Sequence, residues 1–461
     1  IEKENGDRGE ECSIRGDIIV WLYLPQEVIH MNSSAALARQ AGMTDAQWKE
    51  AVKFDSTDWG WIIMSIGMAI GAGIVFLPVQ VGLVGVWVYL FSAIIAYPAI
   101  YLLQRLFINT LADSPRCEDY PSVISGYLGK NWGFLLGILY FLSILICVFM
   151  YSTALTNDSA SFLFSFGVTD TLLSDSPFYG LAIICVMVLI ASRGEQLLFR
   201  VSTLMVLTKL LVVICLGGIM IQHWNLANIG VFPDLGYLVK NTIAMLPVTL
   251  TSILFIPSIS PMVISYRSHN KSIHVARYKA MRAMKIAFSV LFITIFSYAM
   301  SFNLALGHDQ AVLAYSQNIS ALAIVARGFD GSAVKIFSLI LNIFAVMTAF
   351  FSVFLGFREA CQGIAMNILR RFIPEEKISK TVVRHGILIF AVAVAWGAIV
   401  LNAPVLKLLT LLGPIFGIIA CLIPAYLVYK VNALHKYKGI SLVLIVFAGI
   451  LLIISPVIAM M

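Results

Sequence analysis

The sequence predicts an all-α polytopic membrane protein with eleven transmembrane helices. Its 461 residues are 60% hydrophobic and only 12% charged, a combination that soluble domains of this length do not show. Long apolar stretches recur along the chain, and two of them are interrupted by glycine or proline. These features are typical of a helical protein that crosses a bilayer many times and forms a site where helices break.

The apolar stretches give the order of the expected spans. Windows of about 19 residues separate eleven of them. They lie near residues 58–81, 84–108, 132–155, 177–192, 199–222, 241–266, 285–306, 333–356, 385–403, 406–429 and 440–459. Residues 1–57 are mostly polar, so we expect a cytoplasmic amino-terminal segment before a membrane domain over 58–460. Met31 and Met43 are candidates for the biological start, with the residues before it as an upstream extension.

The basic residues predict the orientation. With the amino terminus inside, most of the 31 lysines and arginines fall in cytoplasmic segments, as the positive-inside rule requires. Eleven spans then place the carboxyl terminus outside. The basic stretch 267–285 could be a nucleic-acid patch, but between two spans it is better explained as an amphipathic loop helix near anionic lipid. We therefore expect membrane lipid and no nucleic acid as a partner, and no obligate protein partner is evident.

The first span is interrupted by glycines. Residues 66–78 read Ile-Gly-Met-Ala-Ile-Gly-Ala-Gly-Ile-Val-Phe-Leu-Pro, and both glycine and proline weaken a helix. In lipid, such a segment survives only where it lines a cavity within the protein. Unwound backbone over Ala69–Gly73, including Gly71 and Ala72, would offer free N–H groups to a substrate carboxylate at the start of a half-helix. The alternative is that Gly67, Gly71 and Gly73 only let two helices pack closely.

The sixth span carries a second interruption. Residues 254–261 read Leu-Phe-Ile-Pro-Ser-Ile-Ser-Pro, and each proline removes a helical hydrogen bond. Ser258 and Ser260 could bind the side chain or amino group of a substrate, with Phe255 closing over it. Their hydroxyls could equally satisfy carbonyls that the prolines leave free.

The two interruptions lie five spans apart. Breaks at corresponding positions in two five-span halves are the expected signature of an inverted repeat. We therefore expect a first repeat over 58–222, a second over 241–429, and an extra helix at 440–459.

Lys209 is the one charged residue well inside a predicted span, since no predicted span core holds Asp or Glu. An intramembrane ionisable group is costly and is a functional candidate by default. Among apolar neighbours the ammonium is expected to load and release a proton during transport. Alternatively it snorkels or pairs with a carbonyl. In the eighth span, Thr348 and Ser352 could line an ion site or simply hold helices together.

The remaining motifs exclude other kinds of chemistry. The seven cysteines show no CxxC or Cys/His spacing, so we expect neither a disulfide framework nor a metal site. No GxxxxGK[ST] motif occurs, which argues against ATP-driven pumping. We expect no cofactor, and an ion gradient as the energy source.

Several segments resemble a known family. Met-Ala-Ile-Gly-Ala-Gly-Ile-Val-Phe-Leu-Pro at 68–78 resembles the first span of bacterial hydroxy and aromatic amino acid permeases, especially their serine/threonine branch. Weaker matches are Leu-Tyr-Phe at 139–141, Tyr-Ser-Thr-Ala-Leu-Thr-Asn at 151–157, Ser-Pro at 260–261 and Leu-Gly-Phe-Arg-Glu at 355–359. The resemblance covers about residues 55–460 in span order.

The resemblance implies a leucine-transporter-like fold with broken helices 1 and 6, amino-acid uptake, and coupling to an ion gradient, usually of protons. By position, Ala72 and Gly73 would receive the substrate carboxylate. The pocket would be lined by Ala69, Phe255, Ser258 and Ser260.

The lysine departs from the pattern of that branch. Its serine and threonine carriers often have a lysine in the eighth span, near the place of Thr348. Here Lys209 lies in the fifth span within Val-Leu-Thr-Lys-Leu-Leu. That segment is similar to proton-coupled members of the wider amino acid, polyamine and organocation superfamily, in which a fifth-span lysine stands where sodium-driven carriers hold an ion.

We therefore expect no enzyme but a bacterial inner-membrane symporter for a small neutral amino acid, with L-serine as the leading candidate and protons as the coupling ion. Lys209 would lie on carbonyls near Gly67 and Ile70 and leave them as the pocket opens inward. One alternative is a sodium symporter that uses these carbonyls with Thr348 and Ser352. Others are a proton-coupled carrier of threonine or an aromatic amino acid, and a channel.

Overall fold

The computed structural model describes residues 34–460 except 116, 118–119, 193–194, 271, 329–331 and 370–378. The described part is helical, and no strand occurs in it. Eight helices are long and apolar enough to cross a membrane, or up to ten when each of two bent helix pairs counts as one span. The predicted all-α polytopic fold is therefore confirmed.

The unbroken helices follow the predicted spans in order. They are α6 (Val86–Ala112), α8 (Lys130–Ser165), α10 (Glu195–Met220), α13 (Ile273–Ala305), α16 (Ser332–Leu369), α17 (Lys380–Val400) and α20 (Ile440–Met460). A further span combines α18 (Val405–Phe416), a π-helical segment at Gly417–Leu422 and α19 (Ile423–Lys430). The segment predicted at 177–192 is α9 (Pro177–Ser192), an apolar helix of 16 residues that is shorter than the others. The number eleven stays a prediction.

Two spans are bent, but not at Pro78 or Pro261. The first consists of α4 (Ser56–Ala69) and α5 (Ala72–Val84), which meet at 43°, and the second of α11 (Leu235–Thr251) and α12 (Ile256–His269), at 41°. Pro78 lies inside α5, Pro261 inside α12, and Pro257 in the first turn of α12, where the missing N–H costs nothing. The prediction that Pro261 interrupts the sixth span is wrong, because α12 continues through it, whereas the break after α11 lies directly before Pro257. The first bend follows Ile70.

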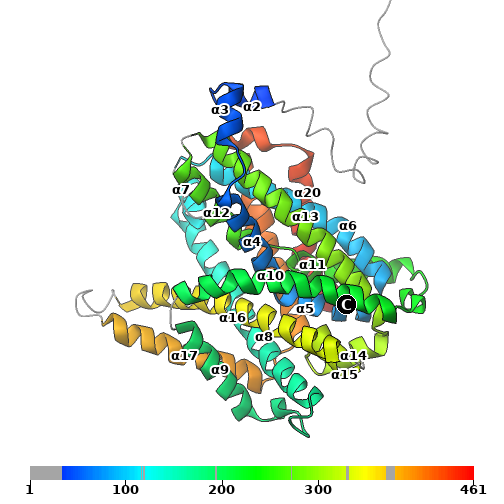
Figure 1. Ribbon diagram of the computed structural model, residues 1–461. Helices are drawn as coiled ribbons and strands as arrows, with labels where there is room; N and C mark the ends of the chain where they lie inside the picture. The colour runs from blue at the N-terminus through cyan, green and yellow to red at the C-terminus, as the bar shows by residue number, and fades with distance from the viewer. Residues whose placement is uncertain are drawn as a thin grey trace, which may run out of the picture.

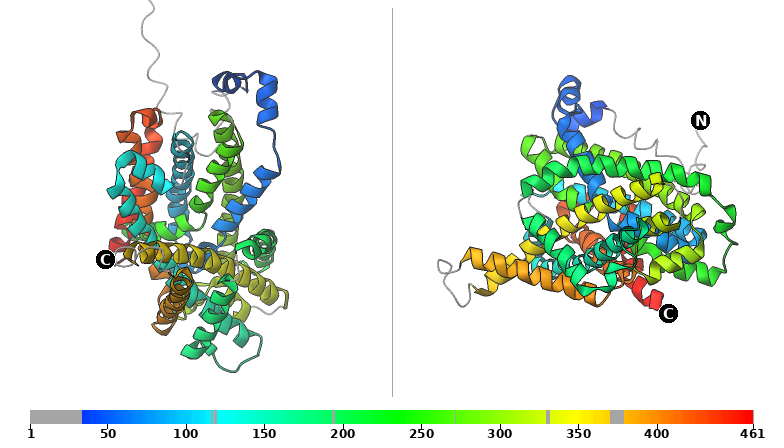
Figure 2. Two further views of the ribbon diagram at one scale, coloured as in Figure 1. Left: turned by 90° about the vertical axis from the view of Figure 1, so that its left-hand side faces the viewer. Right: turned by 60° about the horizontal axis from the view of Figure 1, so that its bottom comes forward.

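The helices form two groups with a shared crossing helix. The bent spans pack with α6 and α13 in one group, and α8, α9, α16 and α17 form the other, below it in Figure 1. Figure 2 shows the same separation from the side in its left view. Helix α10 contacts α4 and α13 on one side and α16 on the other, so residues of α10 can reach both groups.

Short helices cover the two ends of the first group. Helices α2 (Ser34–Gln40) and α3 (Asp45–Ala51) lie at the top of Figure 1, where Trp48 packs with Ala38 against Val275 at the start of α13. Helices α14 (His308–Ser316) and α15 (Ala321–Gly328) lie near the bottom and contact α5. Both ends of the first bent span are therefore covered.

The basic stretch 267–285 is not a separate loop helix. It comprises the end of α12 and the first turns of α13. Arg277 pairs with Asp113, and Lys279 pairs with Asp55 at 2.6 Å. The expected separate loop helix is therefore wrong, because the stretch continues two helices. The contact with anionic lipid stays a prediction.

Candidate functional site

The two bends touch each other through Gly73. A Cβ atom on Gly73 would lie 2.8 Å from Ser252 Cα and 2.9 Å from Thr251 O, so any larger residue would push the start of α5 away from the end of α11. Gly71 precedes α5 as its N-cap and provides no side-chain cap. The first N–H groups of α5 are thus directed at the region between the bends without a capping side chain, as at an anion site.

The other two half-helices are joined by a pair of serines. The hydroxyls of Ser65 on α4 and Ser258 on α12 lie 2.9 Å apart, and both residues are buried. Ser258 also donates to Phe255 O at 2.8 Å, and the Phe255 side chain is fully buried at the start of α12. Ser258 therefore satisfies a carbonyl next to the bend, which was the structural alternative for this residue. Ser65 was not predicted.

The other predicted pocket residues differ in environment. The Ser260 hydroxyl is buried and has no hydrogen-bond partner among the residues that the structure describes. Ala69 is buried at the end of α4. The side chains of Ala72 and Ser352 lie outside the described residues.

Lys209 joins the bend to the second helix group. Its Nζ donates to Gly67 O at 3.2 Å, to Ile70 O at 2.9 Å and to Thr348 Oγ1 at 3.1 Å. Thr348 in turn donates to Phe344 O, so its oxygen accepts from Lys209 while its hydroxyl proton is used elsewhere. An ammonium has three donors and no acceptor, and these three oxygens match them. Two belong to the last turn of α4, where carbonyls lack helical partners and a cation is favourable.

The remaining two glycines of the first bend have different surroundings. A Cβ on Gly67 would lie 2.2 Å from Val206 Cγ2, so this glycine permits the close approach of α10 to α4. A Cβ on Gly71 would lie 3.2 Å from the hydroxyl oxygen of Tyr151 on α8. Close packing and unwound backbone are thus combined in one segment.

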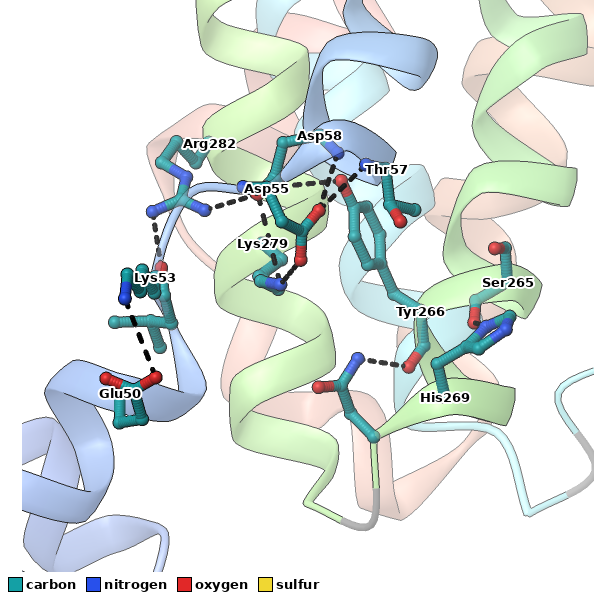
Figure 3. Close-up of polar contacts among 12 residues, drawn as sticks. Glu50, Lys53, Asp55, Thr57, Asp58, Ser265, Tyr266, His269, Lys279 and Arg282 are labelled. Atoms are coloured by element: carbon teal, nitrogen blue, oxygen red, sulfur yellow. Dashed lines mark hydrogen bonds and ion pairs between the residues drawn. The ribbon is translucent and has the colours of Figure 1, made fainter.

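An ionic cluster that was not predicted holds the start of α4 (Figure 3). Asp58 is fully buried and accepts from Tyr266 on α12 at 2.7 Å and from Arg282 on α13 at 2.8 Å. Asp55 accepts from Lys279 at 2.6 Å and caps α4. The signal in the sequence was the spacing of Asp55 and Asp58 before an apolar run, which resembles a capping box.

A second buried carboxylate lies at the opposite end. Asp158 is 1% exposed on α8; it accepts from the Ser320 N–H at 2.8 Å and from Asn342 Nδ2 at 2.5 Å. The expectation that no span core contains an acidic residue is wrong, because α8 runs to Ser165 and not only to residue 155.

Comparison with known proteins identifies the family. The chain is 68% identical over 425 residues to a probable serine transporter of Escherichia coli, covering 92% of this chain and 96% of the relative. It is 29% identical over 407 residues to the serine transporter SdaC of Escherichia coli, covering 86% and 93%. It is 24% identical over 434 residues to the threonine/serine transporter TdcC of Edwardsiella piscicida, covering 88% and 94%.

No family model matches the chain. The relatives are named as transporters and not as enzymes. The matches cover most of the chain, in agreement with its multi-pass helical fold. The chain belongs to the serine/threonine transporter branch of the hydroxy and aromatic amino acid permease family.

Proposed function

We propose that this chain carries L-serine into the bacterial cell across the inner membrane by symport with protons. The observation that carries the coupling part is the Lys209 ammonium on Gly67 O, Ile70 O and Thr348 Oγ1. The substrate follows from the relative at 68% identity, which is named a probable serine transporter. The contact of Gly73 with the end of α11 brings the two bends together, which supports a binding site between them.

The substrate carboxylate would bind the N–H groups at the start of α5, over Gly71, Ala72 and Gly73. The absence of a side-chain cap on α5 supports this role, because a helix N-terminus favours an anion. Ala69 and Phe255 would bound the pocket, and the unpartnered Ser260 hydroxyl would meet a polar group of the substrate. Ser258 would keep the wall of the pocket in place.

Protonation of Lys209 would couple the ion to the bend. The charged ammonium holds the end of α4 to α10 and, through Thr348, to α16. After proton loss the neutral amine has two donors instead of three and no charge to satisfy the carbonyls. Contacts of α4 would then weaken, and α4 would be free to move as the pocket opens inward.

The repeat and the orientation belong to the same proposal. Residues 58–222 and 241–429 would form inverted repeats of the transporter domain, with α20 as an extra helix. The pairing of α4 with α12 and of α5 with α11 supports this arrangement, because inverted repeats bring their broken helices together. The amino terminus would be cytoplasmic and the carboxyl terminus outside.

Sodium coupling is the alternative that the geometry disfavours. A sodium ion at the first bend would need the Gly67 and Ile70 carbonyls and the Thr348 hydroxyl, and the Lys209 ammonium is bonded to all three. A cation added there would meet a like charge, which is unfavourable.

The test uses purified protein in liposomes and labelled L-serine. An imposed proton gradient should drive accumulation without sodium, and a sodium gradient alone should not. Lys209→Ala should lower proton-driven accumulation by about tenfold or more, whereas serine exchange should persist. Lys209→Arg is the matched control, because arginine keeps the charge but does not release its proton; it should also fail to accumulate serine.

Several results would contradict the proposal. Unchanged accumulation and pH dependence in Lys209→Ala would refute the coupling role, and accumulation driven by sodium alone would favour the alternative. Competition by a panel of amino acids addresses the substrate. Stronger competition by threonine or an aromatic amino acid than by serine would overturn the assignment of serine.

A further inference from the structure

The hairpin of α14 and α15 covers the end of α5 that lies away from the bend. His308 Nδ1 lies 2.9 Å from Gly82 O. A Cβ on Gly82 would lie 2.6 Å from Ala311 Cβ, so α14 packs directly on the α5 backbone. Phe76 of α5, Ala314 of α14 and Val405 of α18 lie close together where the hairpin meets α18. Any opening of α5 at this end must therefore move the hairpin.

Asp158 fastens this hairpin to the second helix group. One carboxylate oxygen accepts the Ser320 N–H, and the other accepts from Asn342 Nδ2 on α16. The Asn342 amide also donates to Ser320 Oγ at 2.9 Å, and Ser320 Oγ accepts from the Ala323 N–H at the start of α15. Asp158, Ser320 and Asn342 are all buried. A single carboxylate thus joins α8, α15 and α16.

Three asparagines and one cation surround this contact. The Arg327 guanidinium donates to Gln317 Oε1 at 2.6 Å and interacts with the Asp158 carboxylate through its charge. Asn157 Nδ2 donates to Gln317 O and to Asn402 Oδ1, and Asn318 Nδ2 donates to Asn402 Oδ1 at 3.0 Å. Asn318 and Asn402 both have positive φ, of 50° and 44°, a conformation that asparagine tolerates better than most residues. These hydrogen bonds and the positive φ of Asn318 fix the conformation of the turn between α14 and α15.

Asp58 occupies the corresponding position at the other end of the broken span. It joins α4 to Tyr266 of α12 and to Arg282 of α13, and Arg282 also donates to Val52 O at 2.6 Å. Figure 3 shows these side chains converging on the first turn of α4. Movement of α4 away from α12 must break the contacts of Asp58.

We propose that Asp158 and Asp58 are the two latches of the transport cycle. Asp158 holds the α14–α15 hairpin closed at the outer end, and Asp58 holds α4 against α12 and α13 at the inner end. The proposal rests on the proposed transport function and its orientation. Each latch is a buried carboxylate that bridges three helices, so loss of its acceptors releases one end without direct contact to the substrate site.

Two buried positions report the state of each end. Ala314→Cys lies on the buried face of the hairpin, in α14, and Val263→Cys lies on α12 one turn before Tyr266; both native residues are fully buried. A membrane-impermeant maleimide is applied to right-side-out vesicles for Ala314→Cys and to inverted vesicles for Val263→Cys. The same chain without the reporter cysteine measures labelling of the native cysteines.

Loss of the outer latch should open only the outer end. Asp158→Ala should raise labelling of Ala314→Cys about fivefold or more and leave Val263→Cys unchanged. Asp158→Asn should retain most of the closure, because its amide can still accept from Ser320 N–H and bond to a turned Asn342 amide. Asp309→Asn, an exposed acid on α14, is the control for charge and should change nothing.

Loss of the inner latch should have the opposite pattern. Asp58→Asn and Tyr266→Phe should raise labelling of Val263→Cys and leave Ala314→Cys unchanged. Tyr278→Phe is the matched control, because its ring packs on Trp48 while Asp58 keeps all its contacts. The double variant Asp58→Asn with Asp158→Ala should pass serine down its own gradient and fail to accumulate it.

The outcomes separate this proposal from the transport proposal. Unchanged labelling in Asp158→Ala and Tyr266→Phe would overturn the latches, and so would a joint rise of both reporters in a single variant, since that indicates unfolding. Neither labelling experiment needs serine or an ion gradient. If the reporters respond as expected but from the opposite faces, the latches hold and the proposed orientation falls.

Discussion

Lys209 shows how one side chain can tie a broken helix to its surroundings. Its three donors meet two carbonyls at the end of α4 and the hydroxyl of Thr348 on α16. Burial of an unpaired ammonium in lipid would be very costly, so these contacts favour the bent form of the span. The glycines of the same segment contribute through close packing, since Gly67, Gly71 and Gly73 each leave room for a residue of another helix.

Gly73 and Gly60 differ in the space around their Cα atoms, so their alanine variants can be compared directly. Gly73→Ala should destabilise the protein by about 1–3 kcal/mol, since its Cβ would press on the Ser252 backbone and the core cannot expand freely. Gly60→Ala on α4 has open space around it and should be neutral or slightly stabilising. Thermal unfolding in detergent and serine uptake measure both. Equal behaviour of the two variants would contradict the contact between the bends.

Ser258 and Ser260 should also separate. Ser258→Ala leaves the Ser65 hydroxyl buried without its partner and should cost about 1–3 kcal/mol of stability. Ser260→Ala removes a hydroxyl that already lacks a partner, so stability should hold while the KM for serine rises. Unfolding curves and uptake kinetics test the pair. A rise in KM for Ser258→Ala alone would reverse the two roles.

Two carboxylates, those of Asp55 and Asp58, stabilise the first turn of α4. Asp55 caps the helix, and the Asp58 carboxylate accepts a hydrogen bond from the Asp55 N–H. Burial alone would raise the pKa of Asp55, but the bonds from Lys279 and from backbone N–H groups outweigh it and hold the pKa below its ordinary 3.8. The carboxylate is therefore more stable in the folded than in the unfolded protein.

This shift predicts a pH dependence of stability. Because the folded pKa is the lower one, the contribution of Asp55 is present above about pH 4 and is lost as the pH falls through the folded value. Asp55→Asn keeps a good N-cap but lacks the charge. The difference in Tm between wild type and Asp55→Asn should be constant near neutral pH and shrink below pH 4. A difference that grows on acidification would contradict the ion pair.

In the whole molecule, the broken spans belong to the first helix group, and α5 also contacts α16 of the second group. The two groups meet through α10, through α18 and α15 packed on α8, and through contacts of α15 and α5 with α16. Buried carboxylates fasten the broken spans at both ends, and Lys209 fastens the middle. Under the proposed mechanism, loss of the contacts of one carboxylate would expose only the end of the broken spans that it fastens.

The proposed orientation predicts the location of the chain ends. Alkaline phosphatase fused after α20 should be active, and a fluorescent protein at the same place should stay dark, because only a carboxyl terminus outside the cytoplasm permits the enzyme to fold. A fluorescent protein before α2 should fluoresce. The reverse pattern at the carboxyl end would mean an even number of spans, with α9 as the first helix to re-examine.

Composition and spacing along the chain determined the helical membrane fold, the order of its spans and the two interruptions, and they singled out Lys209 as a charge within a span. These properties are local: lipid demands long apolar helices, and glycine or a buried charge stands out against them. Only the tertiary structure decided which atoms meet across 139 or more positions of sequence, such as Lys209 with Ile70 and Asp58 with Tyr266. Acidic residues near span ends look solvated in the sequence, and their burial depends on neighbouring helices that pack over them. For the same reason, Pro261 is predicted to break its helix from sequence alone, whereas it lies inside α12, and at the first bend the Gly67 and Ile70 carbonyls bond to Lys209 of another helix.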